Sequence, residues 1–484
     1  MVDNIKFFFN PENIAVVGAS NNPQKAGYVI VNNLIKMGYP NKIFPVNSKE
    51  ENILGFKSYP TVYDINDKVE MVVLITPSKE IKRIIEDIEN RMKKWNDIKV
   101  IVCAAAGFGE LKTEEGRERE RILVENSRKY GIRVMGPNCI GVIDNYNRVD
   151  TTFVETLMPP ENKGKGGGIS FISQSGALAA SILMWGASQP VPLQFNKFIS
   201  IGNMADVDFI DLLEYLENDD NTRVIGLYIE GYPKAGELID LMRRIALKKP
   251  IVVLKVGRTS RGAAAANSHT GSLAGEDRVY DSVFRQYGII RVNSIDELMD
   301  TLQAFDRLPI PEGNRLFLLS QAGGPGIFCM DTLSQFEFID FSIIGKKSRE
   351  RLRELLPPMA SFCKPEGYAD ISASATVQHH TDALEILMDD SEVDGVLMIT
   401  VVPTFLPKKE LAEGLVSTYK RIKKHKNKPL FPVIMAGNWV KDIREIIEEN
   451  GIPTFETPDR AARVAANMIK YSLFLKKHNA ERQV

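Results

Sequence analysis

The sequence predicts an α/β protein with three doubly wound domains, each a parallel sheet covered by helices on both faces. Short apolar runs alternate with helical patterns, glycine-rich loops directly follow several of these runs, and the whole pattern starts afresh twice along the chain. Apolar strands that alternate with helices are typical of parallel sheets buried on both faces. A length of 484 residues also agrees with about three domains of ordinary size.

The first predicted domain, residues 1–160, contains four apolar strands, and helical patterns follow the first and the fourth of them. Its first strand ends at Gly18, where the chain must turn into a helix. The other three strands are expected at residues 42–46, 71–76 and 100–104. Short strands separated by helices of this length are expected to pair in parallel.

Two further sections repeat this organisation, and we expect domains at residues 161–308 and 309–484. The second section follows a connector rich in glycine and lysine, and the third follows a segment with two prolines. The second section has strands expected at residues 169–173, 198–201, 224–229, 251–256 and 289–292, and the third at 316–320, 395–401 and 430–435. Both later domains are predicted to be doubly wound like the first.

The composition excludes several classes of protein. With 61 basic and 62 acidic residues, the net charge is −1, so we expect no nucleic-acid partner. The four cysteines form no CxxC pair, which argues against a zinc site or a disulfide framework and agrees with a reducing cytoplasm. No apolar run of about 18 residues and no N-terminal signal pattern is found, so we expect no membrane association.

Three glycine-containing loops lie at predicted carboxyl ends of strands, where open parallel sheets bind their ligands. They are Gly18-Ala19-Ser20, Ser173-Gln174-Ser175-Gly176 and residues 321–326. A helix N-terminus behind each loop would attract phosphate, but a tight turn or an N-cap explains the loops as well. The serine pair favours phosphate at the second loop, and the third stays open between both interpretations. Gly18 alone is not the full dinucleotide fingerprint, which disfavours a nicotinamide oxidoreductase.

His269 is one of five histidines and ends a run of small residues, 257–268. Such a segment suits a loop that approaches a ligand, so the imidazole could be a nucleophile, a base or a metal ligand. An exposed histidine in a flexible loop is the alternative. Glu230 ends a predicted strand and could orient an imidazole, or it could be a solvated loop residue.

Seven short strings, taken together, resemble the ADP-forming acyl-CoA synthetases, also called acetate–CoA ligases (ADP-forming), of the succinyl-CoA synthetase superfamily. Each string alone is weak, but they occur in the family's order and are specific as a set. The strings are VVGAS at residues 16–20, FPVN at 44–47, GPNCIG at 136–141, SQSG at 173–176, SIGN at 200–203, SHTG at 268–271 and GGPG at 323–326.

The resemblance implies a CoA-binding Rossmann-like domain followed by two flavodoxin-like domains. It also implies that acyl-CoA, phosphate and ADP are interconverted with a carboxylic acid, CoA and ATP through an acyl phosphate and a phosphohistidine. His269 matches the phosphorylated histidine, Glu230 the glutamate that steadies it, and residues 173–176 the phosphate-binding helix N-terminus. The implied CoA-binding residues are Gly18, Ala19, Ser20, Val46, Asn47, Ile75, Thr76, Pro77, Ala105, Ala106, Gly107, Phe108 and Asn138.

The sequence departs from the family pattern in two places. We recognise no ATP-grasp domain, which the family carries either fused or on a separate subunit. The resemblance therefore implies an alpha subunit that works with an ATP-grasp beta subunit, as an α2β2 assembly, with Mg²⁺ and ADP or ATP on the partner and no metal ligands here. Residues 366–370 also replace an Asn-Pro-Val-Asp-like string. His379 and His380 lie nearby, and we expect a surface pair rather than a metal site.

Two functions of different classes remain for this architecture. One is the catalytic alpha subunit, and the other is a CoA-binding regulatory protein that has lost catalysis. Because His269 is present together with Glu230 and the serine-rich loop, the sequence favours the enzyme.

Overall fold

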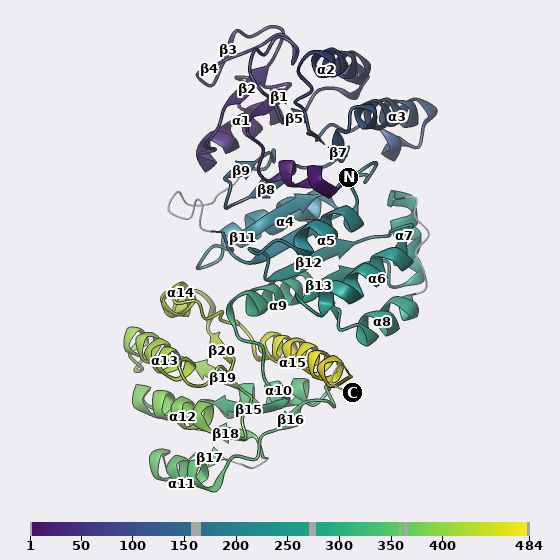
Figure 1. The fold of residues 1–484 in the computed structure, drawn as a ribbon. Helices are drawn as coiled ribbons and strands as arrows, with labels where there is room; N and C mark the ends of the chain where they lie inside the picture. The colour runs from purple at the N-terminus through teal and green to yellow at the C-terminus, as the bar shows by residue number, and fades with distance from the viewer. Residues whose placement is uncertain (1, 156–165, 271–276, 358–359, 363–365, 482–484) are drawn as a thin grey trace. The chain divides into compact units, whose positions relative to one another are not determined.

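A computed structural model describes residues 2–155, 166–270, 277–357, 360–362 and 366–481 (Figure 1). The chain divides into two compact units at residues 283 and 284. Within the described residues, no helix has both the length and the apolar character needed to span a membrane. The expected domain boundary at residue 160 falls outside the described residues, and the boundary at residue 308 stays a prediction.

The first unit contains a five-stranded parallel sheet in the order β2-β1-β5-β6-β7. This order is typical of doubly wound sheets, whose strands end at one common edge. Every strand residue is buried, as the apolar runs predict. The strands are β1 (Ile14–Val17), β2 (Ile43–Val46), β5 (Met71–Leu74), β6 (Val100–Cys103) and β7 (Arg133–Met135), with a small hairpin of β3 (Asn52–Ile53) and β4 (Phe56–Lys57).

Helices α1 (Ala26–Met37), α2 (Ile81–Trp95) and α3 (Glu114–Lys129) pack against this sheet. The apolar face of α2 shows why these helices pack there, since Ile81, Ile84, Ile85 and Ile88 recur at helical spacing and are buried. Gly38 ends α1 in a left-handed conformation, at a φ of 67°, which glycine adopts without strain.

The second sheet of this unit has the order β13-β12-β10-β11-β8-β9. Strands β13, β12, β10 and β11 pair in parallel, and β8 joins β11 in antiparallel pairing. The strands are β8 (Val142–Asp144), β9 (Val149–Asp150), β10 (Ile169–Ser173), β11 (Phe195–Ser200), β12 (Val224–Ile229) and β13 (Ile251–Lys255). The helices are α4 (Gly176–Ala187), α5 (Phe209–Glu217), α6 (Ala235–Ala246), α7 (Ser260–Thr270) and α8 (Asp277–Gln286).

Helix α7 corrects the expectation of a loop before His269. Residues 260–270 form an α-helix instead. Four consecutive alanines lie in this segment, and alanine has the highest helix propensity of all residues. The small side chains of this segment therefore favour a helix and not the expected loop.

The second unit has a sheet in the order β17-β18-β15-β19-β20, with β16 also paired to β15. All pairs are parallel except β17 with β18. The strands are β15 (Arg315–Ser320), β16 (Asp340–Phe341), β17 (Ser361–Phe362), β18 (Tyr368–Asp370), β19 (Gly395–Val401) and β20 (Leu430–Met435); the short strand β14 (Ile290–Arg291) precedes them.

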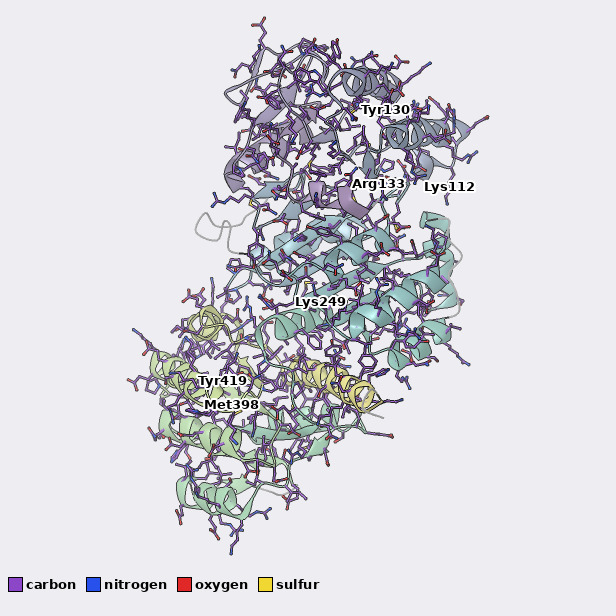
Figure 2. The ribbon with its side chains drawn as sticks, viewed as in Figure 1. Lys112, Tyr130, Arg133, Lys249, Met398 and Tyr419 are labelled. Carbon is purple, nitrogen blue, oxygen red and sulfur yellow. The ribbon has the colours of Figure 1, made fainter. Side chains whose placement is uncertain are left out.

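Helices cover both faces of this sheet (Figure 1). Residues of α11 to α14 form one large apolar core with the strands, in which Met398 and Tyr419 are buried (Figure 2). Helix α15 packs with α9 and α10 on the other face. The helices are α9 (Ile295–Arg307), α10 (Gly323–Leu333), α11 (Lys346–Leu355), α12 (Val377–Asp389), α13 (Lys408–Lys423), α14 (Lys441–Glu449) and α15 (Pro458–Glu481). The predicted α/β class with parallel, helix-covered sheets is confirmed.

Candidate active site

The loops that follow β1, β2 and β5 meet at the carboxyl edge of the first sheet. The backbone N–H of Gly18 donates to the Val46 carbonyl at 3.0 Å, and the Asn47 side chain donates to the Ala19 carbonyl at 2.8 Å. Gly18 has a φ of +95°, and a Cβ there would lie 2.7 Å from the Ile75 oxygen. Only glycine fits this approach, so the loops after β1, β2 and β5 contact one another at this edge.

The N-terminus of α1 is pressed against the same loop at a second glycine, which sequence reasoning missed. A Cβ at Gly27 would lie 2.0 Å from the Gly18 carbonyl oxygen. The first turn of a helix has N–H groups without intrahelical acceptors, and these favour an anion nearby. The repeated glycine after the first strand was the available signal, because close helix–loop contact requires a residue without a side chain.

The loop after β6 lies beside the loop after β5, and the N–H groups of Gly107 and Phe108 are already bonded inside the chain. The N–H of Asn138 donates to the Ala105 carbonyl at 2.9 Å. The Glu110 carboxylate accepts from the N–H groups of Gly107 at 2.5 Å and Phe108 at 3.2 Å. Burial opposes its ionisation, but these bonds and one from Asn203 hold the pKa of Glu110 below its usual range. Glu110 therefore holds the loop in shape.

The Ser173–Gly176 segment, which we call the cradle, lies between β10 and α4. The hydroxyl of Ser173 donates to the Ser175 carbonyl at 2.7 Å, and Ser175 caps α4 by accepting from the Leu178 N–H at 3.3 Å. Both serines thus shape the turn. The N–H groups of the first helical turn have no intrahelical acceptor, which makes this end of α4 suited to a phosphoryl group.

Gln174 joins the cradle to Glu230. Its side-chain oxygen accepts from the N–H groups of Glu230 at 2.8 Å and Gly231 at 3.3 Å, and its side-chain nitrogen donates to the Gly231 carbonyl at 3.0 Å. Gln174 and Glu230 are both buried. Two sequence-predicted site elements, far apart along the chain, therefore meet through one amide.

Tyr228 and Lys255 flank Glu230 and were not singled out from the sequence. Burial, with the nearby charge of Glu230 and a hydrogen bond to its carboxylate, raises the pKa of Tyr228 to about 12. The buried Lys255 ammonium donates to the Glu230 carbonyl at 2.8 Å. Tyr228 lies near the end of β12, two residues before Glu230, and this spacing along an extended chain was the available signal.

The backbone of His269 lies in the last turn of α7. Its side chain lies outside the described residues, so its pairing with Glu230 stays a prediction. Gly271, the last residue of the SHTG string, and residues 272–276 also lie outside the described residues.

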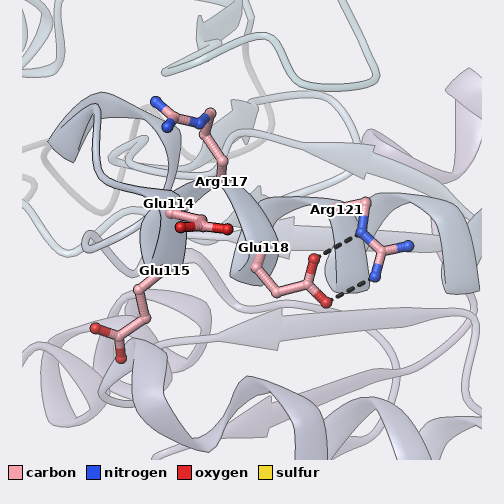
Figure 3. Close-up of a pocket in the computed structure, with 5 residues that line it drawn as sticks. All are labelled: Glu114, Glu115, Arg117, Glu118 and Arg121. Atoms are coloured by element: carbon pink, nitrogen blue, oxygen red, sulfur yellow. Dashed lines mark hydrogen bonds and ion pairs between the residues drawn. The ribbon is translucent and has the colours of Figure 1, made fainter.

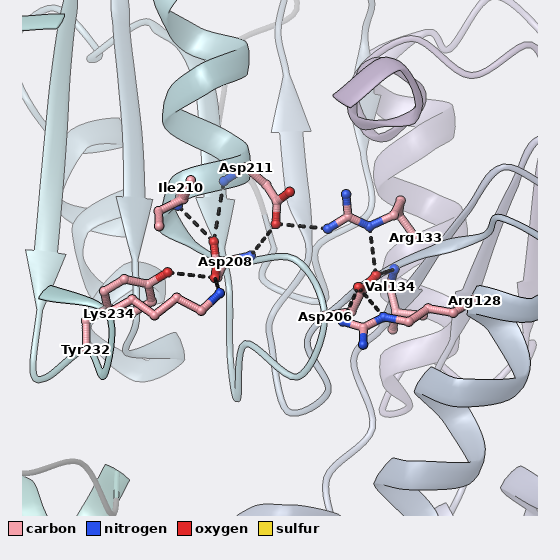
Figure 4. Close-up of polar contacts among 9 residues, drawn as sticks. All are labelled: Arg128, Arg133, Val134, Asp206, Asp208, Ile210, Asp211, Tyr232 and Lys234. Atoms are coloured by element: carbon pink, nitrogen blue, oxygen red, sulfur yellow. Dashed lines mark hydrogen bonds and ion pairs between the residues drawn. The ribbon is translucent and has the colours of Figure 1, made fainter. Parts of the chain in front are cut away.

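A network of carboxylates connects the first sheet to the chain after Glu230 (Figure 4). Asp206 accepts from Arg128 at 2.7 Å and from Arg133 at 3.0 Å, and it is almost fully buried. Asp208, which caps α5, accepts from the Tyr232 hydroxyl at 2.6 Å. The segment 206–208 therefore fixes Tyr232, which lies two residues after Glu230.

The third glycine loop begins α10, as the sequence predicts for a strand-to-helix turn. Gln321 is 1% exposed, and neither atom of its amide has a hydrogen-bond partner among the described residues. Asp370 ends β18, and its carboxylate would lie 3.1 Å from a Cβ at Gly323. Asp370, the acidic residue of the 366–370 segment that differs from the family pattern, thus lies beside the glycine loop.

The expectation of a surface pair is wrong for His380. His379 is half-buried and shares a capping box with Thr376, whereas His380 is fully buried and its Nδ1 lies 2.7 Å from the Thr376 carbonyl. Burial lowers the pKa of His380 to about 4. Within the described ranges, no group of three or more His, Cys, Asp or Glu residues is arranged to hold a metal ion.

A surface hollow on α3 contains none of the predicted site residues (Figure 3). Charged side chains line it, and Glu118 and Arg121 pair across one helical turn at 2.6 Å. An exposed pair of this kind is worth little energy. The hollow is a solvated helix face.

Comparisons with known proteins agree with this arrangement. Residues 12–145 match the CoA binding domain family, and residues 166–305 match the succinyl-CoA ligase-like flavodoxin domain family. The alpha subunit of acetate–CoA ligase (ADP-forming) II from Pyrococcus furiosus is 38% identical, over 96% of this chain and 97% of that protein. A Methanocaldococcus jannaschii acetate–CoA ligase (ADP-forming) is 34% identical, over 97% of this chain and 63% of the relative.

A solved structure shows the same fold. Acetyl-coenzyme A synthetase 1 of Ca. Korarchaeum cryptofilum, in complex with phosphate and ADP, superimposes with a TM-score of 0.88. The two chains are 32% identical, and the match covers 99% of each.

Proposed function

Because this chain belongs to the family of ADP-forming acetate–CoA ligase alpha subunits, we propose that it carries the acyl-CoA and phosphohistidine steps of an ADP-forming acyl-CoA synthetase. Its relatives are ligases by name, and the family's two domains account for the first 305 residues apart from short segments. The roles of individual residues are our assignment.

The reaction runs in three transfers. A phosphate oxygen attacks the thioester carbonyl carbon, the C–S bond breaks, and the CoA thiolate leaves and takes up a proton. The His269 imidazole then attacks the phosphorus of the acyl phosphate, and the carboxylate leaves. Finally, a terminal oxygen of ADP attacks the phosphohistidine, which forms ATP and returns the imidazole.

One observation carries this proposal, namely the link between the cradle and Glu230 through Gln174. The N–H of Glu230 lies 2.8 Å from the Gln174 side-chain oxygen, and Gln174 lies inside the cradle. A helix N-terminus suited to an anion and a buried carboxylate are thus held together. The helix end stabilises charge on the phosphoryl oxygens, and Glu230 stabilises the positive charge that develops on the imidazole.

The carboxyl edge of the first sheet is the proposed CoA site. Residues 18–20, 46–47 and 75–77, with 105–108 and Asn138, would bind CoA there. Close backbone approach at Gly18 and the N-terminus of α1 suit the phosphate groups of a nucleotide. The thiol end of CoA would then extend toward the cradle.

The alpha-subunit names of the relatives imply a partner subunit. We propose that this partner is an ATP-grasp beta subunit in an α2β2 assembly, which holds Mg²⁺ and ADP or ATP. The longer M. jannaschii relative, which this chain covers over 63% of its length, supports a fused form of the same arrangement.

The phosphohistidine is tested by incubating the full chain with acetyl-CoA and labelled phosphate. We expect an acid-labile, base-stable label on wild type. The control His425→Asn should carry the same label, because His425 is exposed and lies just after α13. His269→Asn should abolish the label while CoA binding survives. A label that persists in His269→Asn contradicts the assignment, and CoA binding without any label on wild type would favour the regulatory alternative.

The partner is tested by assaying ATP formation from acetyl-CoA, phosphate and ADP. The purified chain alone should make none, and addition of an ATP-grasp subunit should restore synthesis. Robust synthesis by the chain alone would overturn the split-subunit proposal.

A further inference from the structure

Asn203 contacts side chains from three segments beside the first sheet, namely the turn after β6, helix α3 and the loop after β7. Its side-chain nitrogen donates to Glu110 at 2.7 Å and to Glu120 at 2.9 Å, and its side-chain oxygen accepts from Asn138 at 3.3 Å. Asn203 itself follows β11 of the second sheet. One amide therefore connects the two sheets of the first unit at the edge where both carry predicted site loops.

The two carboxylates that bond to Asn203 also bond to the backbone at residues 107–109. Glu110 accepts from the N–H groups of Gly107 and Phe108, and Glu120 accepts from the Gly109 N–H at 3.2 Å. The two carboxylates share the amide of Asn203. Without it, two neighbouring negative charges would lose a common donor, and their repulsion would disturb the turn that they hold.

Asn203 is held firmly in place at its own backbone. Its N–H donates to the Pro137 carbonyl at 2.9 Å. The preceding Gly202 has a φ of +56°, and a Cβ there would lie 2.2 Å from the same oxygen, so no other residue allows this approach. On the other side, the N–H of Ile201 donates to the Ser173 carbonyl at 3.0 Å. The segment is therefore fixed to the cradle and to the Asn138 loop at once.

We propose that Asn203 is a positioning residue for the CoA site, which sets the 105–108 loop relative to the cradle so that a CoA thioester reaches the phosphoryl site. This inference rests on the proposed function. The proposed role requires no contact between Asn203 and the reacting atoms. It acts through Glu110 and Glu120, so its loss should weaken CoA binding and leave transfer of a phosphoryl group to His269 intact.

The test separates these two activities in the full chain. CoA binding is measured by isothermal titration calorimetry, and histidine phosphorylation by labelled acetyl phosphate, which requires neither CoA nor a partner. Asn203→Ala should bind CoA about tenfold or more weakly, because it loses two hydrogen bonds to charged groups. Its labelling by acetyl phosphate should stay within about twofold of wild type. Asn218→Ala, an exposed asparagine at the end of α5, should match wild type in both assays.

Asn203→Asp gives a readout that a merely structural role would not move. It places a third carboxylate beside Glu110 and Glu120, so its CoA affinity should be below that of Asn203→Ala at pH 8. Like charges raise the pKa of a carboxyl group, and protonation toward pH 5 should restore part of the affinity. Asn203→Ala should show no such recovery beyond that of wild type.

Three outcomes would overturn the positioning role. They are wild-type CoA affinity in Asn203→Ala, equal loss of both activities in both variants, and no difference in pH dependence between the Ala and Asp variants. Failure of the proposed function looks different, because wild type itself would then not bind CoA or would not be labelled by acetyl phosphate.

Discussion

The cradle after β10 and the glycine loop after β15 share the same local hydrogen bonds but have different surroundings. The N–H of Gln174 donates to the Tyr228 carbonyl at 3.3 Å, and the N–H of Gln321 donates to the Ile399 carbonyl at 3.0 Å. In each loop, the preceding serine donates to the carbonyl two residues later at 2.7 Å. A serine and a glutamine after a buried strand therefore produce one turn geometry in two places.

The side chains around the two turns differ. Gln174 bonds to the backbone of Glu230 and Gly231, whereas the amide of Gln321 has no partner among the described residues. The residue two positions after the acceptor Tyr228 is Glu230, which follows β12. The residue two positions after the acceptor Ile399 is Val401, which ends β19. The local turn is thus set by the sequence of the loop, and its coupling to a charged group is set by a distant strand.

Removing the charge of Glu230 should have the largest effect, because it makes the cradle resemble the β15 loop. Glu230→Gln should slow labelling of His269 by acetyl phosphate by about tenfold to a hundredfold, the value of a hydrogen bond to a charged group. The rate is measured by quenched-flow sampling of the label. Glu237→Gln, exposed at the start of α6, is the control. Wild-type rates in Glu230→Gln would show that another group steadies the imidazole.

Substituting the two glutamines directly compares the loops. Gln174→Leu leaves the N–H groups of Glu230 and Gly231 buried without their acceptor, a cost of about 1–3 kcal/mol for each. Gln321→Leu removes an amide that has no partner, so it should cost nothing or stabilise its unit. Hydrogen exchange should accelerate about tenfold or more at residues 230–231 in Gln174→Leu. Comparable acceleration at residues 399–401 in Gln321→Leu would show that the loops are equally coupled.

Tyr228→Phe should have a smaller effect, because it removes one hydroxyl beside Glu230 and keeps the ring. The residue equivalent to Tyr228 beside the β15 loop is Ile399, whose side chain has no polar group. We expect a roughly threefold to tenfold slower labelling, because the Glu230 carboxylate loses one hydrogen-bond donor but keeps its charge. Since the pKa of Tyr228 is raised to about 12, its hydroxyl stays protonated and the wild-type rate should show no step from this group between pH 7 and 10. A step that disappears in Tyr228→Phe would contradict this.

Much of the fold and part of the site could be predicted from local sequence. Buried apolar runs fix parallel strands, and strands fix which loops share an edge, so residues 18–20 and 105–108 could be placed together. The partners of Gln174 and Asn203 could not, because an amide that bonds to backbone or carboxylates far along the chain leaves no local pattern. His380 was misjudged for a related reason, since burial of one histidine of a pair depends on which helix face packs.

The N-caps of the two helices offer the smallest and most local contrast. Ser175 accepts from the Leu178 N–H, so Ser175→Ala should destabilise the first unit by about 1 kcal/mol. Calorimetry of the full chain should show its transition about 2–4 °C lower.

Ala322 is the corresponding N-cap of α10, and Ala322→Ser should gain much less. The residue three positions later is Pro325, which has no N–H, so a hydroxyl at position 322 can accept only from Gly324. We expect a change below about 0.5 kcal/mol, since the better donor is missing. A gain of a full 1 kcal/mol would mean that the α10 N-terminus satisfies a serine as well as α4 does. The absence of a gain would show instead that the proline, rather than the alanine, distinguishes the two turns.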